Sequence, residues 1–186
     1  MPETDPPMAY AGFWRRLTAF AIDMLVFLPP YWLHEQATRV SPLVALVAVL
    51  AINVAGMAYV IGCHARWGQT IGKMVLGIRV VQVDGAPVTV RQALLRSSVD
   101  LAFVLVGIPS TAYVLLTWSG PEWGTMTDLD RNALVVDRDP LNRYSFALET
   151  AWQASEFVVL LFNAKRRALH DFIAGTVVVR SRSEVV

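Results

Sequence analysis

Ionisable side chains inside apolar segments are the residues of this sequence whose types could do chemistry. Asp23, Asp100 and Glu156 each lie in a stretch long and apolar enough to enter a membrane, as does the amide of Asn53. Placing one carboxylate near mid-bilayer costs at least about 2.5 kcal/mol, so each group needs a compensating partner or a function. We expect the three carboxylates to meet at a similar depth, either in ion pairs or in a site that exchanges a proton for a cation.

Arginines lie close in sequence to two of these acidic residues. Arg16 precedes Asp23 by two helical turns, about 10 Å, and Arg96 precedes Asp100 by one turn, about 6 Å. For Arg16 and Asp23 the favoured interpretation is structural, with an ion pair that fixes helix register. Glu156 has no cation nearby in sequence, so for this residue the proton-exchange interpretation is favoured.

The other reactive residues form no recognised catalytic or metal-binding pattern. His34, His64 and His170 lack a second ligand at metal-site spacing, and the single cysteine, Cys63, cannot form an internal disulfide. The glycines of residues 68–73 have the wrong spacing for a phosphate-binding loop, and no nucleophile elbow or His-Glu-x-x-His motif occurs. We therefore expect no enzyme activity, no catalytic residue, no metal and no cofactor.

The composition is that of an integral membrane protein. Of 186 residues, 55% are hydrophobic and only 17% are charged, whereas about a quarter are charged in a typical soluble domain. The formal net charge of +1 gives no bias towards nucleic acid as a partner. The first fourteen residues contain no Lys or Arg, so we expect no cleavable signal peptide and a first span that is retained.

Apolar segments predict an all-α fold, a four-helix transmembrane bundle in a single domain of residues 1–186. The spans are expected at about residues 17–33, 43–62, 99–118 and 145–163. The fourth contains Glu149, Gln153 and Glu156. It is retained because these residues form one polar stripe with Asn163, and because a basic run, residues 165–167, follows at once.

The segments between the spans predict a small sheet. Residues 78–83 and 87–90 flank Asp84-Gly85, a hairpin signal because the turn needs positive φ. The β-branched run 176–179, after a short interfacial helix at 168–173, is expected to join this hairpin in a three-stranded sheet. A helix at 176–180 would refute this pairing. Residues 119–144, rich in Gly, Pro and acidic residues, are expected to form a loop.

Basic residues predict a multi-pass protein of the cell (inner) membrane with both termini in the cytoplasm. Twelve of the sixteen Lys and Arg residues precede the first span, lie in the loop 63–98 or follow the fourth span. The loop 63–98 and the tail 164–186 then face the cytoplasm, and residues 119–144 face outside. Side chains expected to contact anionic lipid headgroups on the inner side are Lys73, Arg79, Lys165, Arg166 and Arg167.

Three ordered motifs resemble those of the RDD family of membrane proteins, named for one arginine and two aspartates. Residues 12–23 resemble the opening motif, in which Arg16 and Asp23 match the first two namesakes. Residues 68–87 resemble the central loop, and residues 165–176, which include His170 and Asp171, resemble the C-terminal signature. The resemblance implies that Asp171 is the second namesake aspartate, with Asp100 as the rival assignment.

The resemblance implies two functions, and both stay open. Some members of the family have been linked to cation/proton exchange, and related domains occur in scaffolding components of membrane quality-control complexes. The first function is an oligomeric protein of the bilayer that binds or exchanges protons or small cations. The second is a non-transporting scaffold that docks a protein partner or anionic lipid on its cytoplasmic face. The acidic segment 119–144 and the polar fourth span depart from the family pattern.

Overall fold

A computed structural model describes residues 9–120, 122–139 and 141–181 of the chain. The ends of the two tails, residues 1–8 and 182–186, which the predicted topology places in the cytoplasm, lie outside the described residues. The chain divides into two compact units. The first comprises Met1–Leu25, Val60–Ser97 and Ala154–Val186, and the second comprises Val26–Tyr59 and Ser98–Gln153.

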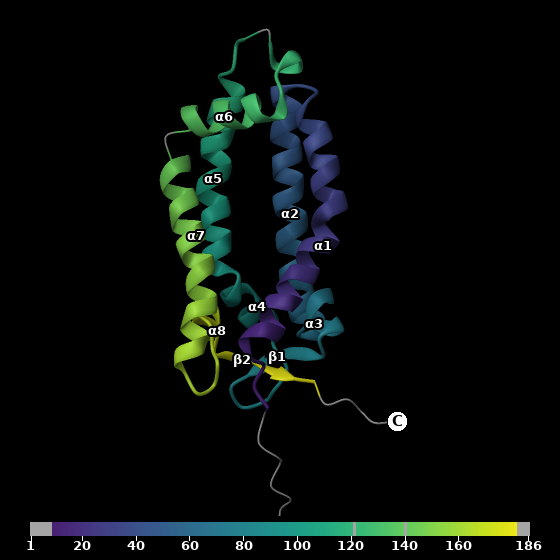
Figure 1. The fold of residues 1–186 in the computed structure, drawn as a ribbon, viewed down its shortest axis with the longest axis vertical. Coiled ribbons are helices and arrows are strands. Elements are labelled where there is room, and N and C mark those ends of the chain that lie inside the picture. Colours follow the sequence, from purple (N-terminus) through teal and green to yellow (C-terminus); the bar gives the residue numbers. More distant parts are fainter. Residues whose placement is uncertain (1–8, 121, 140, 182–186) are drawn as a thin grey trace, which may run out of the picture. The chain divides into compact units, whose positions relative to one another are not determined.

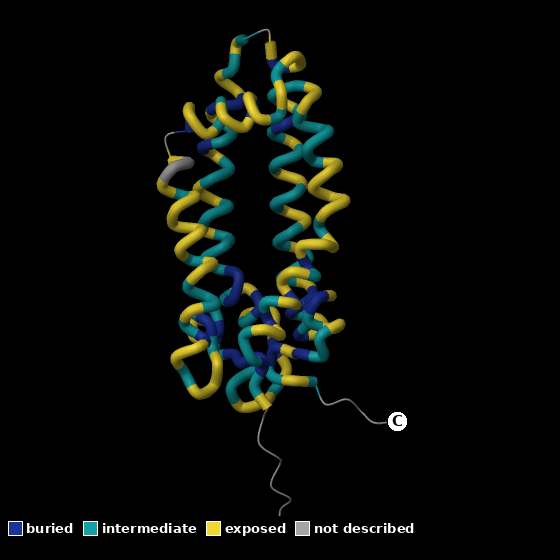
Figure 2. Tube along the Cα trace, viewed as in Figure 1, coloured by how far each residue is buried: buried dark blue, intermediate teal, exposed yellow. Residues whose placement is uncertain are grey.

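Three of the described helices are long and apolar enough to cross a membrane. They are α1 (Phe13–Thr38), α2 (Pro42–Trp67) and α5 (Ser98–Leu116), labelled in Figure 1. They agree with the first three predicted spans, and α1 continues through Pro29 and Pro30. Few of their residues are buried within the protein, as Figure 2 shows, which suits helices whose apolar surface faces lipid.

The fourth predicted span is not confirmed. Residues 145–163 largely coincide with α7 (Asn142–Val159) and the 3-10 helix η2 (Leu160–Phe162), but α7 is not among the helices that are apolar enough to span. The predicted polar stripe also ends early, because Asn163 lies beyond both helices. Its amide nitrogen donates to the carbonyls of Val159 and Arg167 at 2.8 Å each, which closes a turn instead.

The segment 119–144 is largely helical, so the prediction of a loop is wrong. In the second unit it forms the 3-10 helix η1 (Trp123–Thr125) and α6 (Asp128–Arg138). The start of α6 is stabilised by a capping box in which Thr127 and Asp130 each accept a hydrogen bond from the other's backbone N–H. Gly, Pro and Asp predicted a loop, but these residues are also frequent at the starts of helices, so composition alone could not separate the two.

A two-stranded antiparallel sheet lies in the first unit. Strand β1 (Ile78–Gln82) pairs with β2 (Thr176–Arg180), with Val80 opposite Val178. This pairing confirms the predicted strand at 176–179 and its partner. A short helix is present where one was predicted at 168–173: it is α8 (Leu169–Ala174), which ends at Gly175 in the left-handed conformation.

The predicted third strand at residues 87–90 is wrong. The turn is present, with Gly85 at a φ of 90°, but Pro87 contributes only an isolated bridge to Val81. Thr89 instead caps the short helix α4 (Val90–Arg96), and its capping box with Gln92 satisfies the first N–H groups of that helix. A Pro followed by a strong N-cap therefore ends the strand after a single bridge.

Buried residues of the first unit gather around this sheet and the short helices (Figure 2). The core cluster comprises Ala11, Ala19, Ile78, Val80, Val88, Ala93 and Val178. The helix α3 (Ile71–Val75) packs against α1 through Gly72, where a Cβ would lie only 2.0 Å from the carbonyl oxygen of Ala19. Only glycine permits this close approach of two backbones.

We predict that Gly72→Ala destabilises the protein by about 1–3 kcal/mol, because the added methyl meets backbone atoms that cannot move aside cheaply. The free energy of unfolding in detergent checks this. Gly62→Ala is the matched control, since nothing lies within 4 Å of its added Cβ and alanine favours helix. Equal stability of the Gly72→Ala variant and the wild type would show that the contact is looser than described.

Candidate functional site

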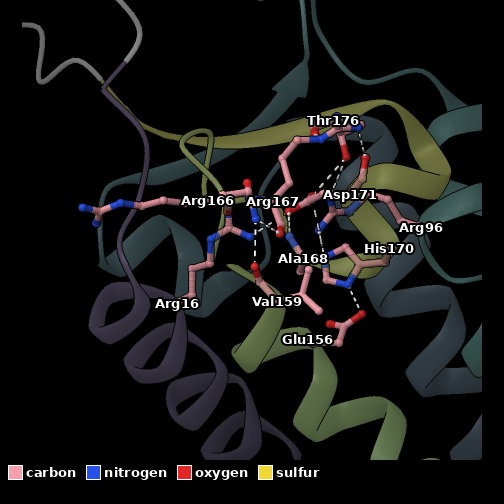
Figure 3. Close-up of polar contacts among 11 residues, drawn as sticks. Arg16, Arg96, Glu156, Val159, Arg166, Arg167, Ala168, His170, Asp171 and Thr176 are labelled. Carbon is pink, nitrogen blue, oxygen red and sulfur yellow. Dashed lines mark hydrogen bonds and ion pairs between the residues drawn. The ribbon is translucent and has the colours of Figure 1, made fainter. Parts of the chain in front are cut away.

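A buried carboxylate, Asp171 in the first turn of α8, is the centre of a polar cluster (Figure 3). One of its oxygens, Oδ2, accepts a hydrogen bond from Arg16 Nη1 at 2.8 Å and from the backbone N–H of Ala168 at 3.0 Å. The other, Oδ1, accepts from Arg96 Nη1 and from the hydroxyl of Thr176 at 3.1 Å. Four donors therefore satisfy the carboxylate, and two of them are guanidinium groups.

These contacts connect elements that are distant in the sequence. Arg16 lies near the start of α1, Arg96 is the last residue of α4, and Thr176 is the first residue of β2. Arg96 Nη1 also donates to the hydroxyl of Thr176 at 2.7 Å, and Arg16 Nη2 donates to the carbonyl of Arg166 at 2.5 Å. The Asp171 cluster, defined by Arg16, Arg96, Asp171 and Thr176, thus fixes α1, α4, α8 and β2 together.

Charge pairing keeps the buried carboxylate ionised. Burial alone would raise the pKa of Asp171, but the neighbouring cations, Arg96 foremost, outweigh this effect and hold the pKa well below its usual range. Arg167 also contacts the cluster: its guanidinium group donates to the backbone carbonyls of Asp171 at 2.8 Å and Thr176 at 3.1 Å. A buried carboxylate paired with two guanidinium groups is suited to structure rather than to proton transfer.

His170 connects Arg96 of the Asp171 cluster to Glu156 on α7. His170 contacts Glu156 Oε1 through Nδ1, and its Nε2 lies 2.6 Å from Arg96 Nη2. Because a guanidinium only donates, Nε2 must accept, so Nδ1 carries the proton and donates it to Glu156. The partners thus assign a neutral imidazole. Sequence reasoning missed this pair because its members are fourteen residues apart, although His170 lies in the C-terminal family motif.

Asp23 is bound by donors from the segment around α3. Its Oδ2 accepts from the hydroxyl of Thr70 at 2.6 Å, and its Oδ1 accepts from the backbone N–H of Gly72 at 2.8 Å. The side chain predicted as the partner of Asp23, Arg16, binds Asp171. These contacts give Asp23 a part in docking α3 on α1.

Two predicted site residues belong to the second unit. The amide of Asn53 donates to the carbonyl of Val49, one turn earlier in its own helix, at 2.9 Å. Asp100, in the first turn of α5, accepts from Trp152 Nε1 at 3.1 Å. The arginine expected beside Asp100, Arg96, lies against Asp171. Asp23, Asp100 and Glu156 thus each have a different described partner.

The basic residues expected at lipid headgroups differ in their surroundings. Arg79, Lys165 and Arg166 are exposed. Arg167 is engaged within the cluster, and its guanidinium also lies 4.1 Å from the centroid of the Phe172 ring. Lys73 is half-buried beside Thr70, and burial lowers the pKa of its ammonium group to about 8. Within the described ranges, no group of three or more His, Cys, Asp and Glu residues could hold a metal ion.

The fold and this cluster define a helical membrane protein with three candidate spanning helices and a polar cluster in its first unit. The model of the RDD family matches residues 10–175, and the chain belongs to this family. It is 25% identical over 182 residues, which are 94% of the chain and 83% of the relative, to the uncharacterized membrane protein YteJ of Bacillus subtilis (strain 168). No solved structure is significantly similar to the chain.

We predict that Asp171→Asn destabilises the protein by about 3–5 kcal/mol, because it leaves the buried charges of Arg16 and Arg96 without a counterion. The free energy of unfolding in detergent measures this. Asp137→Asn, at an exposed position on α6, is the matched control and should change stability by less than about 0.5 kcal/mol.

The same variant tests the pH dependence. A carboxylate with a lowered pKa in the folded state stabilises the protein above its unfolded pKa of about 4, and this contribution is lost as the pH falls below that value. The wild type should therefore lose stability below about pH 4 more steeply than Asp171→Asn. Parallel curves would mean that Asp171 is not the group responsible.

Proposed function

We propose that this protein binds and releases protons at the contact between Glu156 and His170, and works as a proton/small-cation exchanger. The observation that carries the proposal is the placement of His170 between a carboxylate and a guanidinium. An imidazole can carry either one proton or two, so His170 is the group at this contact that can bind a proton and release it.

An added proton must change the contacts of His170. In the neutral tautomer, Nδ1 donates to Glu156 and Nε2 accepts from Arg96. A proton on Nε2 would place two donors face to face, so His170 and Arg96 would separate. Arg96 keeps Asp171 and Thr176 as partners, so it can lose this contact without becoming an unpaired buried charge. The site can therefore accept a proton while the Asp171 cluster stays intact.

The charges around His170 set the exchange. It faces Glu156 from α7, Arg96 from α4 and Asp171 within α8, whose Oδ1 lies 3.7 Å from Nε2, and Arg16 of α1 lies beyond Asp171. The charges of Arg16 and Arg96 balance those of Glu156 and Asp171. One more proton on His170 therefore gives the site an excess positive charge. Among the described contacts, Glu156 has no arginine partner, so protonated His170 would be its counterion. A small cation could bind the Glu156 oxygens only by displacing His170, so the protonated imidazole and the cation would compete for one carboxylate.

The proposed topology has four spans, with α7 as the fourth, in the cell membrane and with both termini in the cytoplasm. The distribution of the basic residues supports it. Glu156 then lies near the cytoplasmic end of α7. We further propose a homo-oligomer, because four spans alone enclose only a thin pathway.

We predict that Glu156→Gln lowers cation-dependent proton flux in proteoliposomes by about tenfold or more, because it removes the carboxylate that proton and cation share. Glu149→Gln, an exposed residue of the same helix, is the matched control and should keep wild-type flux. Asp23→Asn should lower stability through the lost Thr70 and Gly72 contacts rather than act on flux alone.

Wild-type flux equal to that of empty liposomes would remove the exchange proposal. The alternative, a non-transporting scaffold that docks a protein partner or lipid on its cytoplasmic face, predicts this outcome. It also predicts that a stoichiometric protein partner copurifies with the chain in mild detergent.

Cysteine labelling tests the proposed topology. In a Cys63→Ser background, a cysteine at position 145 should react with an impermeant maleimide added outside the cell, and one at position 181 should not. Position 127 serves as a second outer site, although Thr127 also caps α6. Reversed labelling would invert the assignment of sides.

A further inference from the structure

A pocket of about 750 Å³ lies in the first unit, beside the start of α1. It is lined by residues 12–15, residues 160–164, Arg166 and Arg180. The pocket is separate from the Asp171 cluster, which it meets only through Arg166, whose backbone carbonyl binds Arg16. Its lining combines three arginines with aromatic and aliphatic side chains and contains no acidic residue.

The guanidinium groups of the pocket are free to bind an anion. Arg15, Arg166 and Arg180 are all exposed. Among the described residues, the guanidinium groups of Arg166 and Arg180 have no hydrogen-bond or ion-pair partner, and Arg15 makes one long contact of 3.4 Å to the carbonyl of Leu76. A guanidinium has five N–H donors in a planar fork that matches the oxygens of a phosphate. Three such groups at one pocket, with no carboxylate among them, favour a phosphate ligand.

The backbone holds Arg166 in place at this pocket. Arg166 has a φ of 48°, a left-handed conformation that is uncommon outside glycine. The side-chain amide of Asn163 stabilises this turn. Its nitrogen donates to the carbonyl of Arg167 at 2.8 Å, and its oxygen accepts from the backbone N–H of Arg167 at 2.7 Å. The guanidinium of Arg166 then lies over Gly12, where a Cβ would be 2.4 Å from Nη1. The position of this cation is thus set by the fold, and not only by a flexible side chain.

The apolar wall shows what kind of phosphate compound fits. Trp14 is 74% exposed, Leu161 60% and Phe162 82%. They adjoin the arginines at the point where α1, a candidate spanning helix, begins at Phe13. Trp and basic residues at the end of a span are typical of the headgroup level of a bilayer. A soluble phosphate would leave this apolar wall uncovered, whereas a phospholipid would cover it with an acyl chain.

We propose that the pocket is a binding site for one anionic phospholipid. Its phosphate is bound by Arg15, Arg166 and Arg180, and its acyl chains lie along Trp14, Leu161 and Phe162. The inference rests on membership of a membrane protein family and on the pocket itself, and it is independent of proton exchange.

Native mass spectrometry of the purified full chain, with phosphatidylglycerol or phosphatidylcholine added, tests the site. We expect one phosphatidylglycerol to be retained in preference to phosphatidylcholine. The double variant Arg166→Gln, Arg180→Gln should weaken its binding about tenfold or more, because it removes two charge-assisted contacts. Arg91→Gln is the control for a lost charge, since Arg91 is exposed in the same unit but does not line the pocket. This control should retain the lipid.

Three outcomes would overturn the proposal. Equal retention of the two lipids would mean that the headgroup charge is not recognised. Equal loss in Arg91→Gln would indicate general attraction to the basic surface. Displacement of the lipid by millimolar inorganic phosphate would indicate a site for a free anion. Phe162→Ser separates these cases further, because it should weaken phospholipid binding and leave phosphate binding unchanged. The thermal unfolding of each variant should match the wild type, since all these side chains are exposed.

Discussion

The ion pairs of Asp171 with Arg16 and Arg96 are the interaction on which the first unit depends. A buried carboxylate and two buried guanidinium groups are tolerated only together, because each would be costly to bury alone. These contacts form only when the start of α1, the end of α4 and the start of α8 lie beside one another. Strand β2 follows directly from α8 in the chain. The pairing of β1 with β2 and the packing around Val178 then complete a core that the long helices cannot supply themselves.

The ion pairs of Asp171 stabilise the fold, whereas the charged groups proposed to act in function, Glu156 and His170, lie beside them. Arg16 and Arg96 are both paired with Asp171 in a buried position, so a change of partner would leave a buried charge unpaired. Glu156 and His170 lie beside the cluster, where His170 contacts Arg96 and lies 3.7 Å from Asp171 through Nε2. Of the three arginines that line the pocket, Arg166 belongs to the turn whose carbonyl binds Arg16. The Asp171 cluster thus adjoins both candidate sites, one through Arg96 and the other through the bond from Arg16 to the carbonyl of Arg166.

The sequence predicts the features that depend on local pattern and misses those that depend on distant contacts. Hydropathy predicts the three long helices, and β-branching predicts β2. Helical spacing, however, directed attention to Asp23 as the partner of Arg16, whereas Asp171 lies 155 residues away. The errors at residues 87–90 and 119–144 have a different cause. There, the N-caps Thr89 and Thr127 start helices that composition alone had assigned to a strand and a loop.

The three family motifs are far apart in the sequence but lie in the same folded unit. Residues 12–23, 68–87 and 165–176 all belong to the first unit, and the segment that departs from the family pattern, 119–144, belongs to the second. The motifs supply Arg16, the α3 turn that binds Asp23, and Asp171 with His170. Arg96 lies outside all three, yet it contacts both Asp171 and His170. The family signature therefore describes one folded unit, and the structure shows that Arg96, which the sequence places near Asp100, binds in the polar cluster of that unit.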